Sequence, residues 1–403
     1  MDGINGVHDP TIIEHEGIYY LFSTDTQQPA TAGIPIRSST DLVHWQFEKT
    51  ALSEMPTQAV DWSQAQGLWA PEVINYQQTF RMYYSASTFG STTSFIGLAT
   101  APHPLGPWVD QGEIVKTSPT LAGHNAIDAN IVTDRDQGQW LVYGSFFGGI
   151  YLAPIDKQTG KLTKDGYGQR IAYRPASVDT AIEGAFIHYH PQTDMYYLFV
   201  SFDSLHDSYH MRVARAKEIT GPYLDWRGQE MMNQEVDPAE IGTKLLGSYQ
   251  FSHTPAVYAP GHNSIFRSSD QHSFLIHHAR RKPFSEDFYL NVRKLYWLEN
   301  GWPVVSAMTY QQETIDEPTE EEILGEWEIV QFTATSDITC SQQQTIEHVK
   351  KSDEGYLWKE QAFVAYFEEN DGMKQLCLSG IDAQGYSFIG KKIQGIHEKL
   401  ATV

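Results

Sequence analysis

Short apolar runs alternate with polar turns over roughly the first 300 residues of the chain. One unit recurs five times: a polar residue, a short apolar run, a polar turn and an aromatic-rich run. Examples are "DPTIIEHEGIYYLFSTD" from Asp9 and "DANIVTDRDQGQWLVYGS" from Asp128, and the other copies begin at Pro71, Glu183 and Gly261. β-Branched and aromatic residues bounded by Asn, Asp and Gly turns are typical of strands. No stretch longer than a few residues has helical periodicity, so we predict an all-β fold.

A third apolar run follows each copy, as in "IPIRSSTDLVHW" and "NVRKLYWLENGW". Repetition of one antiparallel multi-strand unit is the signature of a β-propeller. A β-sandwich is the main alternative, but it would not repeat the same unit five times in one register. We therefore predict a five-bladed β-propeller over residues 1–312. A small β-barrel-like domain over residues 319–403 should follow it, built from short strands such as "QAFVAYF".

The predicted blades place five polar residues at one end of the central channel. The first strand of every blade lines the channel, so the residue at its mouth points towards the axis. The five mouths carry Asp9, Glu72, Asp128, Glu183 and His262. Acidic groups from different blades should converge there, and such clustering shifts pKa values.

Three of these acids are candidates for catalysis. An Asp before Pro, as at Asp9, often only opens a turn. Asp128 in "AIDAN" and Glu183 in "AIEGAF" instead lie among small apolar residues, and burying a carboxylate is costly unless it is paired or used. We take these three acids, at equivalent positions of the repeat, as the catalytic candidates. Glu72 in "WAPEV" is interpreted as structural.

His262, in "APGHNSIF", is the candidate metal ligand. The default for such a residue is a core histidine with satisfied hydrogen bonds, but its place in the fifth repeat puts it on the channel axis. A lone His does not make a zinc site, which takes three or four N or S ligands. One calcium ion surrounded mostly by water suits the position better. His277 and His278, in "LIHHAR", are expected to pack within a strand.

Two further stretches are candidates for contacts with a ligand. Trp69, in "GLWAPEV", either forms a wall on which a sugar ring stacks or fills the space between two blades. The small residues of "YGSFFGGI", residues 143–150, either permit the close approach of a ligand or mark a bulge.

The composition narrows the classes of partner. The chain has 28 Lys and Arg against 50 Asp and Glu, a formal charge of −22, which disfavours binding to nucleic acids and anionic membrane surfaces. Nothing resembles a transmembrane span of about 20 apolar residues, and the first residues lack the features of a signal peptide. Cys340 and Cys377 could pair with each other or be two ordinary buried thiols.

Six segments together resemble glycoside hydrolase family 43, and within it the endo-arabinanases: "HDPTII", "WAPEV", "AIDANIV", "YGSFFGGIYL", "AIEGAF" and "APGHNSIF". The resemblance implies a five-bladed propeller that cleaves internal α-1,5-L-arabinofuranosidic bonds of arabinan with inversion. It implies that Asp9 is the general base, that Asp128 orients and tunes its partner acid, and that Glu183 is the general acid.

The resemblance also implies the remaining site residues. His262 matches a histidine that is associated with a central calcium ion. Two segments match those that contact substrate, namely Asn125, Ala126 and Ile127, and Ser145, Phe146 and Phe147. Phe147 stands where the arabinanase pattern carries Trp, so a stacking ring is kept while the affinity of that subsite could differ. The implied partners are arabinan and arabino-oligosaccharides.

The implied chemistry agrees with the acids found in the repeat. An inverting glycosidase needs a protonated acid at the leaving oxygen and an ionised base for the attacking water, with the two carboxyl groups roughly 6.5–9.5 Å apart. Asp9 and Glu183 come from different blades and could span such a gap. We expect Asp128 to raise the proton affinity of Glu183 by like-charge repulsion.

Alternatives of three kinds stay open. An exo-acting α-L-arabinofuranosidase or β-xylosidase on the same fold would have a blocked pocket instead of a groove open at both ends. A non-catalytic sugar-binding propeller does not need three buried acids. A structural propeller does not need them either. The C-terminal domain could bind polysaccharide or cap the propeller.

Three features outside the site are also predicted. The acidic run from Glu313 to Glu322 is interpreted as a solvated linker. The resemblance favours an extracellular location with the leader absent from this chain, and a cytoplasmic location is the alternative. We expect the protein to be a monomer.

Overall fold

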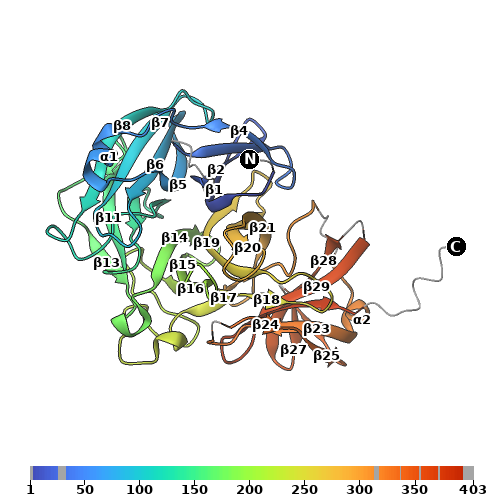
Figure 1. The fold of residues 1–403 in the computed structure, drawn as a ribbon. Coiled ribbons are helices and arrows are strands. Elements are labelled where there is room, and N and C mark those ends of the chain that lie inside the picture. The colour runs from blue at the N-terminus through green and yellow to red at the C-terminus, as the bar shows by residue number, and fades with distance from the viewer. Residues whose placement is uncertain are drawn as a thin grey trace.

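Five antiparallel sheets follow one another around a common axis, and one further large sheet lies beside the last two of them (Figure 1). The structure is a computed structural model, which describes residues 3–25, 33–312, 317–335, 337–353, 355–370 and 373–393. The all-β fold and the five-bladed propeller are confirmed.

Blades 1 and 2 each have four strands in sequential order. Blade 1 consists of β1 (Val7–His15), β2 (Ile18–Asp25), β3 (Pro35–Ser39) and β4 (Gln46–Thr50). The short helix α1 (Thr57–Ser63) lies in the connection to blade 2. Blade 2 consists of β5 (Trp69–Tyr76), β6 (Thr79–Ser87), β7 (Ser94–Ala101) and β8 (Val109–Thr117).

Blades 3 to 5 repeat the same order from the axis outwards. Blade 3 has β9 (Asn130–Thr133), β10 (Gln139–Tyr143), β11 (Ile150–Asp156) and β12 (Lys161–Leu162), and β13 (Gln169–Ala172) also pairs with β11. Blade 4 has β14 (Ile182–His190), β15 (Met195–Phe202), β16 (His210–Ala216) and β17 (Thr243–Leu246). Blade 5 has β19 (Tyr258–Arg267), β20 (Ser273–Arg280), β21 (Phe288–Trp297) and β22 (Pro303–Val305). A single turn of 3₁₀ helix at Ala176–Val178 precedes blade 4, and another at Pro238–Glu240 lies between its strands β16 and β17.

The second strand of a blade is buried on both faces, because each blade packs between two neighbours. β6, "TFRMYYSAS", is buried at every position after its first, and so is β15, "MYYLFVSF". The outermost strand differs: β4, "QFEKT", has no buried residue. Burial thus decreases to the rim in blade 1, whereas the outermost strands β17 and β22 of blades 4 and 5 are fully buried and contact the C-terminal sheet.

The ring closes between blade 5 and the beginning of the chain. The inner strand β1 contacts both β5 and β19. The N–H of Gly6 donates to the carbonyl of Phe288, and the N–H of Leu290 donates to the carbonyl of Ile4. The first residues that the structure describes thus form hydrogen bonds along β21 of the last blade. The beginning and the end of the propeller segment therefore take part in the same sheet.

The C-terminal part is a seven-stranded antiparallel sheet in the order β25-β23-β30-β29-β28-β27-β26. Its strands are β23 (Gly325–Gln331), β25 (Gln342–Ile346), β26 (Lys350–Ser352), β27 (Gly355–Trp358), β28 (Gln361–Asn370), β29 (Met373–Ile381) and β30 (Ser387–Lys392). The edge strands β25 and β26 do not pair with each other among the described residues, so the sheet is an open half-barrel. A short parallel pair, β18 (Tyr249–Gln250) with β24 (Thr339–Cys340), joins it to blade 4.

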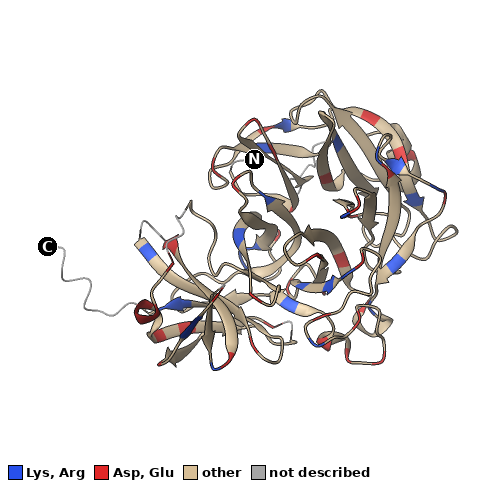
Figure 2. Cartoon of the chain, turned by 180° about the vertical axis from the view of Figure 1, so that it is seen from behind, with Lys and Arg blue, Asp and Glu red and all other residues tan. Residues whose placement is uncertain are grey.

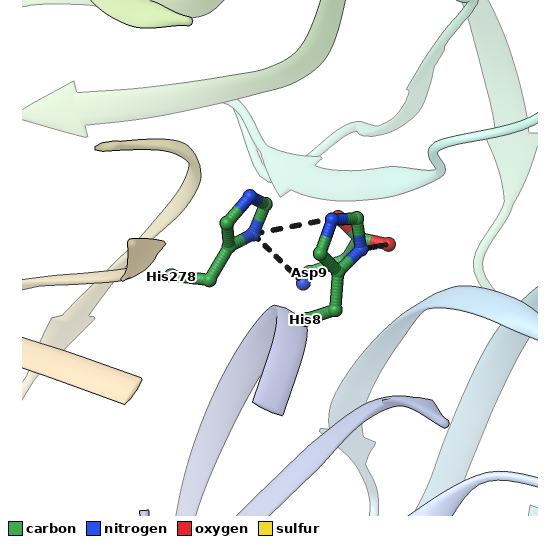
Figure 3. A group of neighbouring side chains, drawn as sticks. All are labelled: His8, Asp9 and His278. Atoms are coloured by element: carbon green, nitrogen blue, oxygen red, sulfur yellow. Dashed lines mark hydrogen bonds and ion pairs between the residues drawn. The ribbon is translucent and has the colours of Figure 1, made fainter. Parts of the chain in front are cut away.

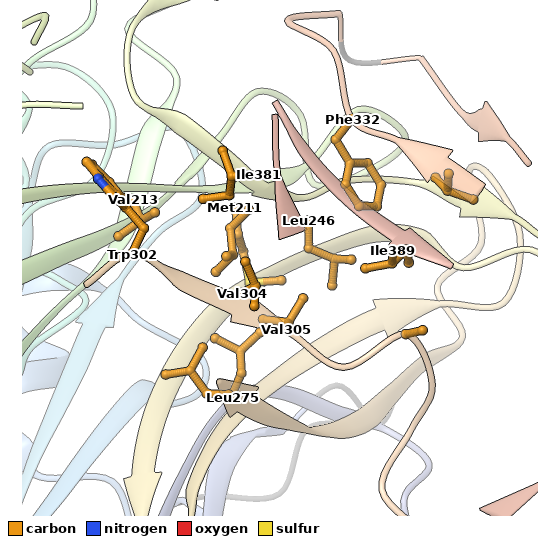
Figure 4. Close-up of a cluster of buried hydrophobic side chains, with 14 of the residues drawn as sticks. Met211, Val213, Leu246, Leu275, Trp302, Val304, Val305, Phe332, Ile381 and Ile389 are labelled. Atoms are coloured by element: carbon orange, nitrogen blue, oxygen red, sulfur yellow. The ribbon is translucent and has the colours of Figure 1, made fainter. Parts of the chain in front are cut away.

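One hydrophobic core is shared by blades 4 and 5 and the C-terminal sheet (Figure 4). Propeller residues such as Met211, Leu246 and Val305 pack in it with C-terminal residues such as Phe332 and Ile389. Polar contacts flank this core, since the Ser379 hydroxyl donates to the carbonyl of Val305 at 2.6 Å and the Ala307 N–H donates to the Tyr366 hydroxyl at 2.9 Å. The contact between the two parts is therefore core-like and not a loose tether.

Part of the predicted linker is helical. Residues 313–316 lie outside the described residues, but Glu320–Ile323 forms the short helix α2. Thr319 caps it, with its hydroxyl accepting the N–H of Glu322 and the Glu322 carboxylate accepting the N–H of Thr319. Acidic residues in a first helical turn are favourable. Glu320, Glu321 and Glu322 are exposed, as expected of a solvated segment, but they form a capped helical turn that the sequence did not predict.

The cysteines, the helices and the charged residues bear on the remaining features of the sequence. Cys340 is exposed and Cys377 is buried, and they form no disulfide with each other. Neither described α-helix is long or apolar enough to cross a membrane. Figure 2 shows basic and acidic residues interspersed over both parts of the chain.

Candidate active site

Each blade enters its inner strand through a residue with a positive φ. These residues are Asp9 (48°), Ala70 (39°), Asp128 (61°), Gly184 (58°) and His262 (48°). In β1, β5, β14 and β19 the pairing with the second strand is interrupted at this residue, as in a β-bulge. A bulge re-aims the side chain that it carries, and here it directs the residue away from the ladder.

The N–H group of the bulge residue is satisfied by the neighbouring blade. Four such bonds go to a side chain on the second strand of the preceding blade: Asp9 to His278 Nδ1 (3.2 Å), Ala70 to Thr24 Oγ1 (2.7 Å), Asp128 to Ser85 Oγ (3.0 Å) and His262 to Ser201 Oγ (2.7 Å). The fifth differs, because the N–H of Gly184 donates to Asp128 Oδ2 at 3.2 Å. One carboxylate thereby replaces the usual second-strand acceptor.

The predicted equivalence of the five mouths is wrong at two positions. Asp9, Asp128 and His262 are bulge residues, but Glu183 lies one residue before its bulge residue and Glu72 lies two residues after Ala70. The strand pairing agrees, since Glu72 faces Tyr83 as Thr11 faces Phe22. A bulge adds one residue without a sequence signal of its own, and alignment by apolar runs therefore misplaced these two acids.

The Asp9 carboxylate is buried among hydrogen-bond donors (Figure 3). Its Oδ2 accepts from Thr24 Oγ1 at 2.7 Å and lies 2.8 Å from His8 Nδ1, while its Oδ1 lies 3.0 Å from His262 Nδ1. Burial alone would raise the pKa of Asp9, but His262 and His8 hold it well below its ordinary value. Asp9 is therefore an ionised carboxylate that is locked in one orientation.

His278 does more than the predicted packing within a strand. Its ring stacks on that of His8 at 3.9 Å, and its Nδ1 accepts the N–H of Asp9. His8, Asp9 and His278 each place a potential metal-ligating atom within 4.8 Å of the others. These atoms already bond to one another (Figure 3), so the group serves to fix Asp9.

Asp128 and Glu183 form the second acidic group. Asp128 is buried, and its pKa is raised to about 7 by burial and by the negative charges of Glu183 and Asp9. Glu183 is half-buried, and its Oε2 accepts from Ser145 Oγ at 2.8 Å. Because burial and the neighbouring negative charges disfavour its ionised form, Asp128 keeps its proton at pH values where isolated carboxyl groups have lost theirs.

His262 lies between the acidic groups. Burial lowers its pKa, but Asp9, Asp128 and Glu183 together raise it to about 9. Its ring is therefore cationic near neutral pH, and it balances part of the negative charge at the axis.

The axis offers a limited donor set for a calcium ion. Calcium takes roughly six to eight oxygen ligands, whereas His262 contributes one ring nitrogen, because its Nδ1 already contacts Asp9. The three nearby carboxylates supply the negative charge that such a cation requires. A cation held at Nε2 of His262 would keep most of its water, and the imidazolium would have to release its proton before that nitrogen could act as a ligand.

Glu72 lies apart from this group, as the structural interpretation predicts. It is buried, with Oε2 accepting from Thr11 Oγ1 at 2.9 Å and Oε1 accepting from Asn130 Nδ2 at 2.8 Å. Asn130 Oδ1 in turn accepts the N–H of Ile187 at 2.9 Å. Glu72 therefore ties together the inner strands of blades 1, 2 and 3, and Asn130 extends the connection to blade 4.

A cavity of about 1030 Å³ opens above these carboxylates. Asp9, Asp128, Glu183 and His262 line it, so side chains from four blades meet in one place as predicted. A profile of the family described as glycosyl hydrolases family 43 matches residues 4–303, which is nearly the whole propeller. This chain belongs to glycosyl hydrolase family 43.

Curated relatives within family 43 include both endo- and exo-acting proteins. The extracellular endo-α-(1→5)-L-arabinanase of Thermotoga petrophila is 33% identical over 365 residues, which cover 80% of this chain and 75% of the relative. The extracellular exo-α-(1→5)-L-arabinofuranosidase ArbA of Cellvibrio japonicus is 33% identical over 319 residues, covering 74% of this chain and 86% of the relative.

A solved family 43 structure also matches beyond the propeller. The crystal structure of a family 43 glycoside hydrolase from Bacillus licheniformis has a TM-score of 0.87 and 27% identity, and the match covers 98% of this chain and 99% of that one. This extent of coverage includes the C-terminal sheet, so the two-part architecture occurs in another family 43 protein.

The structure places most of the substrate-contact candidates of this family 43 chain at the cavity. Trp69, Asn125, Ile127, Ser145, Phe146 and Phe147 line it. Ala126 does not, because it is fully buried and its N–H donates to Ser94 Oγ at 3.0 Å. Phe147 is exposed at 38%, so its ring is available to a ligand.

Further residues complete the cavity and were missed from the sequence. His8, Thr24 and Ser87 belong to strands, whereas Phe89, Asp203, His206 and Glu286 lie in connecting loops. Phe89 is 80% exposed in the turn between β6 and β7. The repeat could have indicated Thr24, because Thr24 and Ser201 are each the last residue but one in the second strand of their blade. The loop residues have no equivalent in the repeat.

Proposed function

We propose that this family 43 glycoside hydrolase cleaves internal α-1,5-L-arabinofuranosidic bonds of arabinan with inversion. The observation that carries the proposal is the pair Asp9 and Glu183, which come from blades 1 and 4 and line one cavity in different surroundings. Asp9 is fixed and ionised among three imidazoles. Glu183 instead stands next to a second acid and a single hydroxyl donor.

Asp9 is the general base in this proposal. An ionised carboxylate on one side of the sugar can accept a proton from a water molecule as that water attacks the anomeric carbon. The contacts from Thr24 and the imidazoles keep the carboxylate in place, so little reorganisation is needed when the proton arrives.

Glu183 is the general acid. It gives its proton to the glycosidic oxygen as the bond from that oxygen to the anomeric carbon breaks, and the sugar passes through an oxocarbenium-like state. Asp128 supports it through charge, since it interacts with Glu183 and its Oδ2 accepts the N–H of the adjacent Gly184. After one turnover Asp9 holds the proton of the water and Glu183 has lost its own, and exchange with solvent restores both.

Endo action is favoured by the relatives and by the cavity. The endo-acting Thermotoga petrophila relative matches a larger share of this chain than the exo-acting Cellvibrio japonicus relative does. The cavity reaches from Phe89 in blade 2 to Glu286 in blade 5, so a chain could extend past the carboxylates on both sides.

Product profiling on linear 1,5-arabinan tests the activity and its mode together. Early release of mixed oligosaccharides is the expected result. Release of arabinose alone from the first minutes would mean an exo-acting enzyme, and binding of arabinan without new reducing ends would mean a sugar-binding protein. Proton NMR of the first anomer formed checks inversion.

We also propose one calcium ion at His262, with water as its other main ligand. When bound, the ion would supply positive charge beside the acids at the axis. The test is the calcium content of chelator-treated and reloaded protein, together with the thermal midpoint. His262→Ala should abolish both calcium uptake and the calcium-dependent rise of the midpoint, whereas equal uptake by both proteins would contradict the assignment.

Secretion and a monomeric state belong to the same proposal. Relatives named as extracellular support the first, and immunodetection in the medium of the native cells tests it. Light scattering of the full chain tests the second, with the mass of one 45.6 kDa chain expected.

A further inference from the structure

One edge of the cavity is formed by the loop between β15 and β16, residues 203–209. Asp203, Ser204, Leu205, His206 and Ser208 from this loop all line the cavity. The loop is held at several points by neighbouring blades. Arg174 Nη1 donates to Asp203 Oδ1 at 2.5 Å, Arg280 Nε donates to the carbonyl of Leu205 at 2.5 Å, and the N–H of Phe284 donates to the carbonyl of His206 at 3.1 Å.

A further anchor is His210, which is 1% exposed. Its Nδ1 lies 2.9 Å from the carbonyl of Ser208, and its Nε2 lies 3.0 Å from Nε of Arg212. Because the guanidinium can only donate, Nε2 is the acceptor and Nδ1 carries the proton that bonds to Ser208. Burial lowers the pKa of His210 well below its ordinary value, and Arg212 adds to the effect, so the ring stays neutral.

Arg212 connects this histidine to the C-terminal part of the chain. Its guanidinium is 1% exposed, and Nη2 donates to the carbonyl of Ala334 at 3.0 Å. Nη1 donates to carbonyls of the segment before β17, namely those of Ala239, Ile241 and Gly242. Ala334 follows β23, so a continuous path runs from the C-terminal sheet through Arg212 and His210 to Ser208 at the cavity.

A neighbouring lysine offers a contrast within the same contact. Lys244 pairs with Arg212 across β16 and β17 and is also buried. Its Nζ donates to the carbonyl of Thr335, the residue after Ala334. No bond joins Lys244 to His210 in the described part of the chain. Arg212 and Lys244 thus both donate hydrogen bonds to the same C-terminal segment. Arg212 alone of the two is also bonded to His210, which contacts the cavity loop.

The C-terminal sheet itself presents little surface for stacking on sugars. Among its described residues the aromatic side chains are buried, except Phe367 and Tyr386, which are half-buried. Lys374 lies over the ring of Phe367 and Arg227 lies over that of Tyr386. A sugar-binding platform needs open aromatic faces, so the contacts of this sheet with blade 4 are the better guide to its role.

We propose that His210 and Arg212 are positioning residues through which the C-terminal sheet fixes the cavity loop 203–209. The inference rests on the proposed function for its kinetic part alone. The carbonyl of Ala334 fixes the position of the Arg212 guanidinium by a hydrogen bond. The guanidinium in turn orients the His210 ring, and that ring holds the carbonyl of Ser208. A loop that is already ordered can contact arabinan without a further loss of conformational entropy. A released loop must be ordered each time substrate binds, which weakens binding.

Four full-length variants test this path: Arg212→Met, Lys244→Met, His210→Leu and His210→Asn. Asn can present Nδ2 where His presents Nδ1, so it keeps the bond to Ser208, and Leu cannot. Kinetics on linear arabinan should show KM raised about tenfold in Arg212→Met and His210→Leu with kcat within about twofold. Lys244→Met and His210→Asn should stay near the wild-type KM. The thermal midpoint should fall in both Met variants, since both lose a contact to the same C-terminal segment.

Hydrogen exchange gives a readout that needs no substrate. Amide exchange over residues 203–209 should become faster in Arg212→Met and His210→Leu and stay unchanged in Lys244→Met. Unchanged exchange in His210→Leu, or equal acceleration in the two Met variants, overturns the proposal. If Arg212→Met does not fold, the comparison of His210→Leu with His210→Asn decides alone. A wild-type protein inactive on arabinan would refute the proposed function, while the exchange data would still decide this inference.

Discussion

Blades 1 and 2 enter their inner strands with the same backbone but different chemistry. Asp9 and Ala70 are both bulge residues with positive φ, and a proline follows each of them. Each N–H is accepted by a side chain on the second strand of the preceding blade, His278 for Asp9 and Thr24 for Ala70. The bulge is thus a structural device of the fold, and the side chain that it carries decides whether a blade takes part in catalysis.

The acid of blade 2 shows the other half of this lesson. Glu72 lies two residues beyond the bulge, and its carboxylate is used to join inner strands by hydrogen bonds from Thr11 and Asn130. A displacement of two residues therefore separates a carboxylate that faces the cavity from one that holds the ring together.

The strongest test of the comparison exchanges the acids for amides. Asp9→Asn and Glu183→Gln should each lower kcat on arabinan by about 10³-fold or more, because each removes a proton-transfer group. The matched variant Ala70→Ser changes the same bulge position in blade 2 and should keep activity within about twofold. Thermal midpoints within a few degrees of wild type establish that the proteins are folded. Substantial activity in either amide variant would contradict the assigned roles.

Thr24 joins the two bulges and allows a second test. Its hydroxyl donates to Asp9 Oδ2 and accepts the N–H of Ala70, both at 2.7 Å. Thr24→Val should cost about 1–3 kcal/mol of unfolding free energy, since a buried N–H loses its acceptor. It should also lower kcat, by about tenfold, through the lost contact to Asp9. Chemical unfolding and kinetics measure the two effects, and Thr24→Ser, which keeps the hydroxyl, should restore both. Equal behaviour of the Val and Ser variants would show that the hydroxyl bridge is unimportant.

Glu72 predicts a difference in the pH dependence of stability. Burial raises its pKa to about 7 from its ordinary value of 4.5. The folded state then binds more protons than the unfolded state between these two values, so the unfolding free energy of the wild type falls as pH rises through this window. Glu72→Gln cannot ionise there, and its stability relative to wild type should rise by on the order of 3 kcal/mol from pH 4 to pH 8.

Denaturant titrations at several pH values measure this difference. Glu16→Gln is the control, because that carboxylate has 79% of its side chain exposed on the turn after β1. Parallel stability curves for wild type and Glu72→Gln would mean that folding does not raise the pKa of Glu72.

The smallest effect is expected at Ala70 itself. An alanine at φ 39° is strained by its Cβ, and glycine removes that strain while adding entropy to the unfolded chain. Ala70→Gly should therefore change the unfolding free energy by less than about 1 kcal/mol and leave kcat unaltered. Differential scanning calorimetry detects a change of this size. A large loss of stability would show that packing of the Ala70 methyl group contributes more free energy than the backbone strain costs.

The sequence allowed the propeller to be predicted because its signals are local. Runs such as "IYYLF" and "MYYLF" form the second strands of blades 1 and 4, and the turns before them contain Gly17 and Asp194. Five copies then leave few alternatives. The acids of the cavity followed from the same repeat, since Asp128 and Glu183 stand out among small apolar neighbours.

The register of those acids was beyond the sequence for a physical reason. The five bulge residues are Asp, Ala, Asp, Gly and His, so no side-chain type marks the bulge, and only two of them precede proline. Cavity loops such as residues 203–209 were missed because they are shaped by contacts from other blades. The order of the C-terminal sheet was likewise hidden, since β23 pairs with β25 on one side and with the distant β30 on the other.

The shared core of blades 4 and 5 with the C-terminal sheet limits how this chain can be divided. A protein ending after Val305 would leave Leu246, Val304 and Val305 facing water, because their partners Phe332 and Ile389 would be missing. An exposed apolar face of this kind favours aggregation. The propeller and the C-terminal sheet are therefore expected to melt in a single cooperative transition, and exchange of either part between relatives would require the contact surface to be redesigned with it.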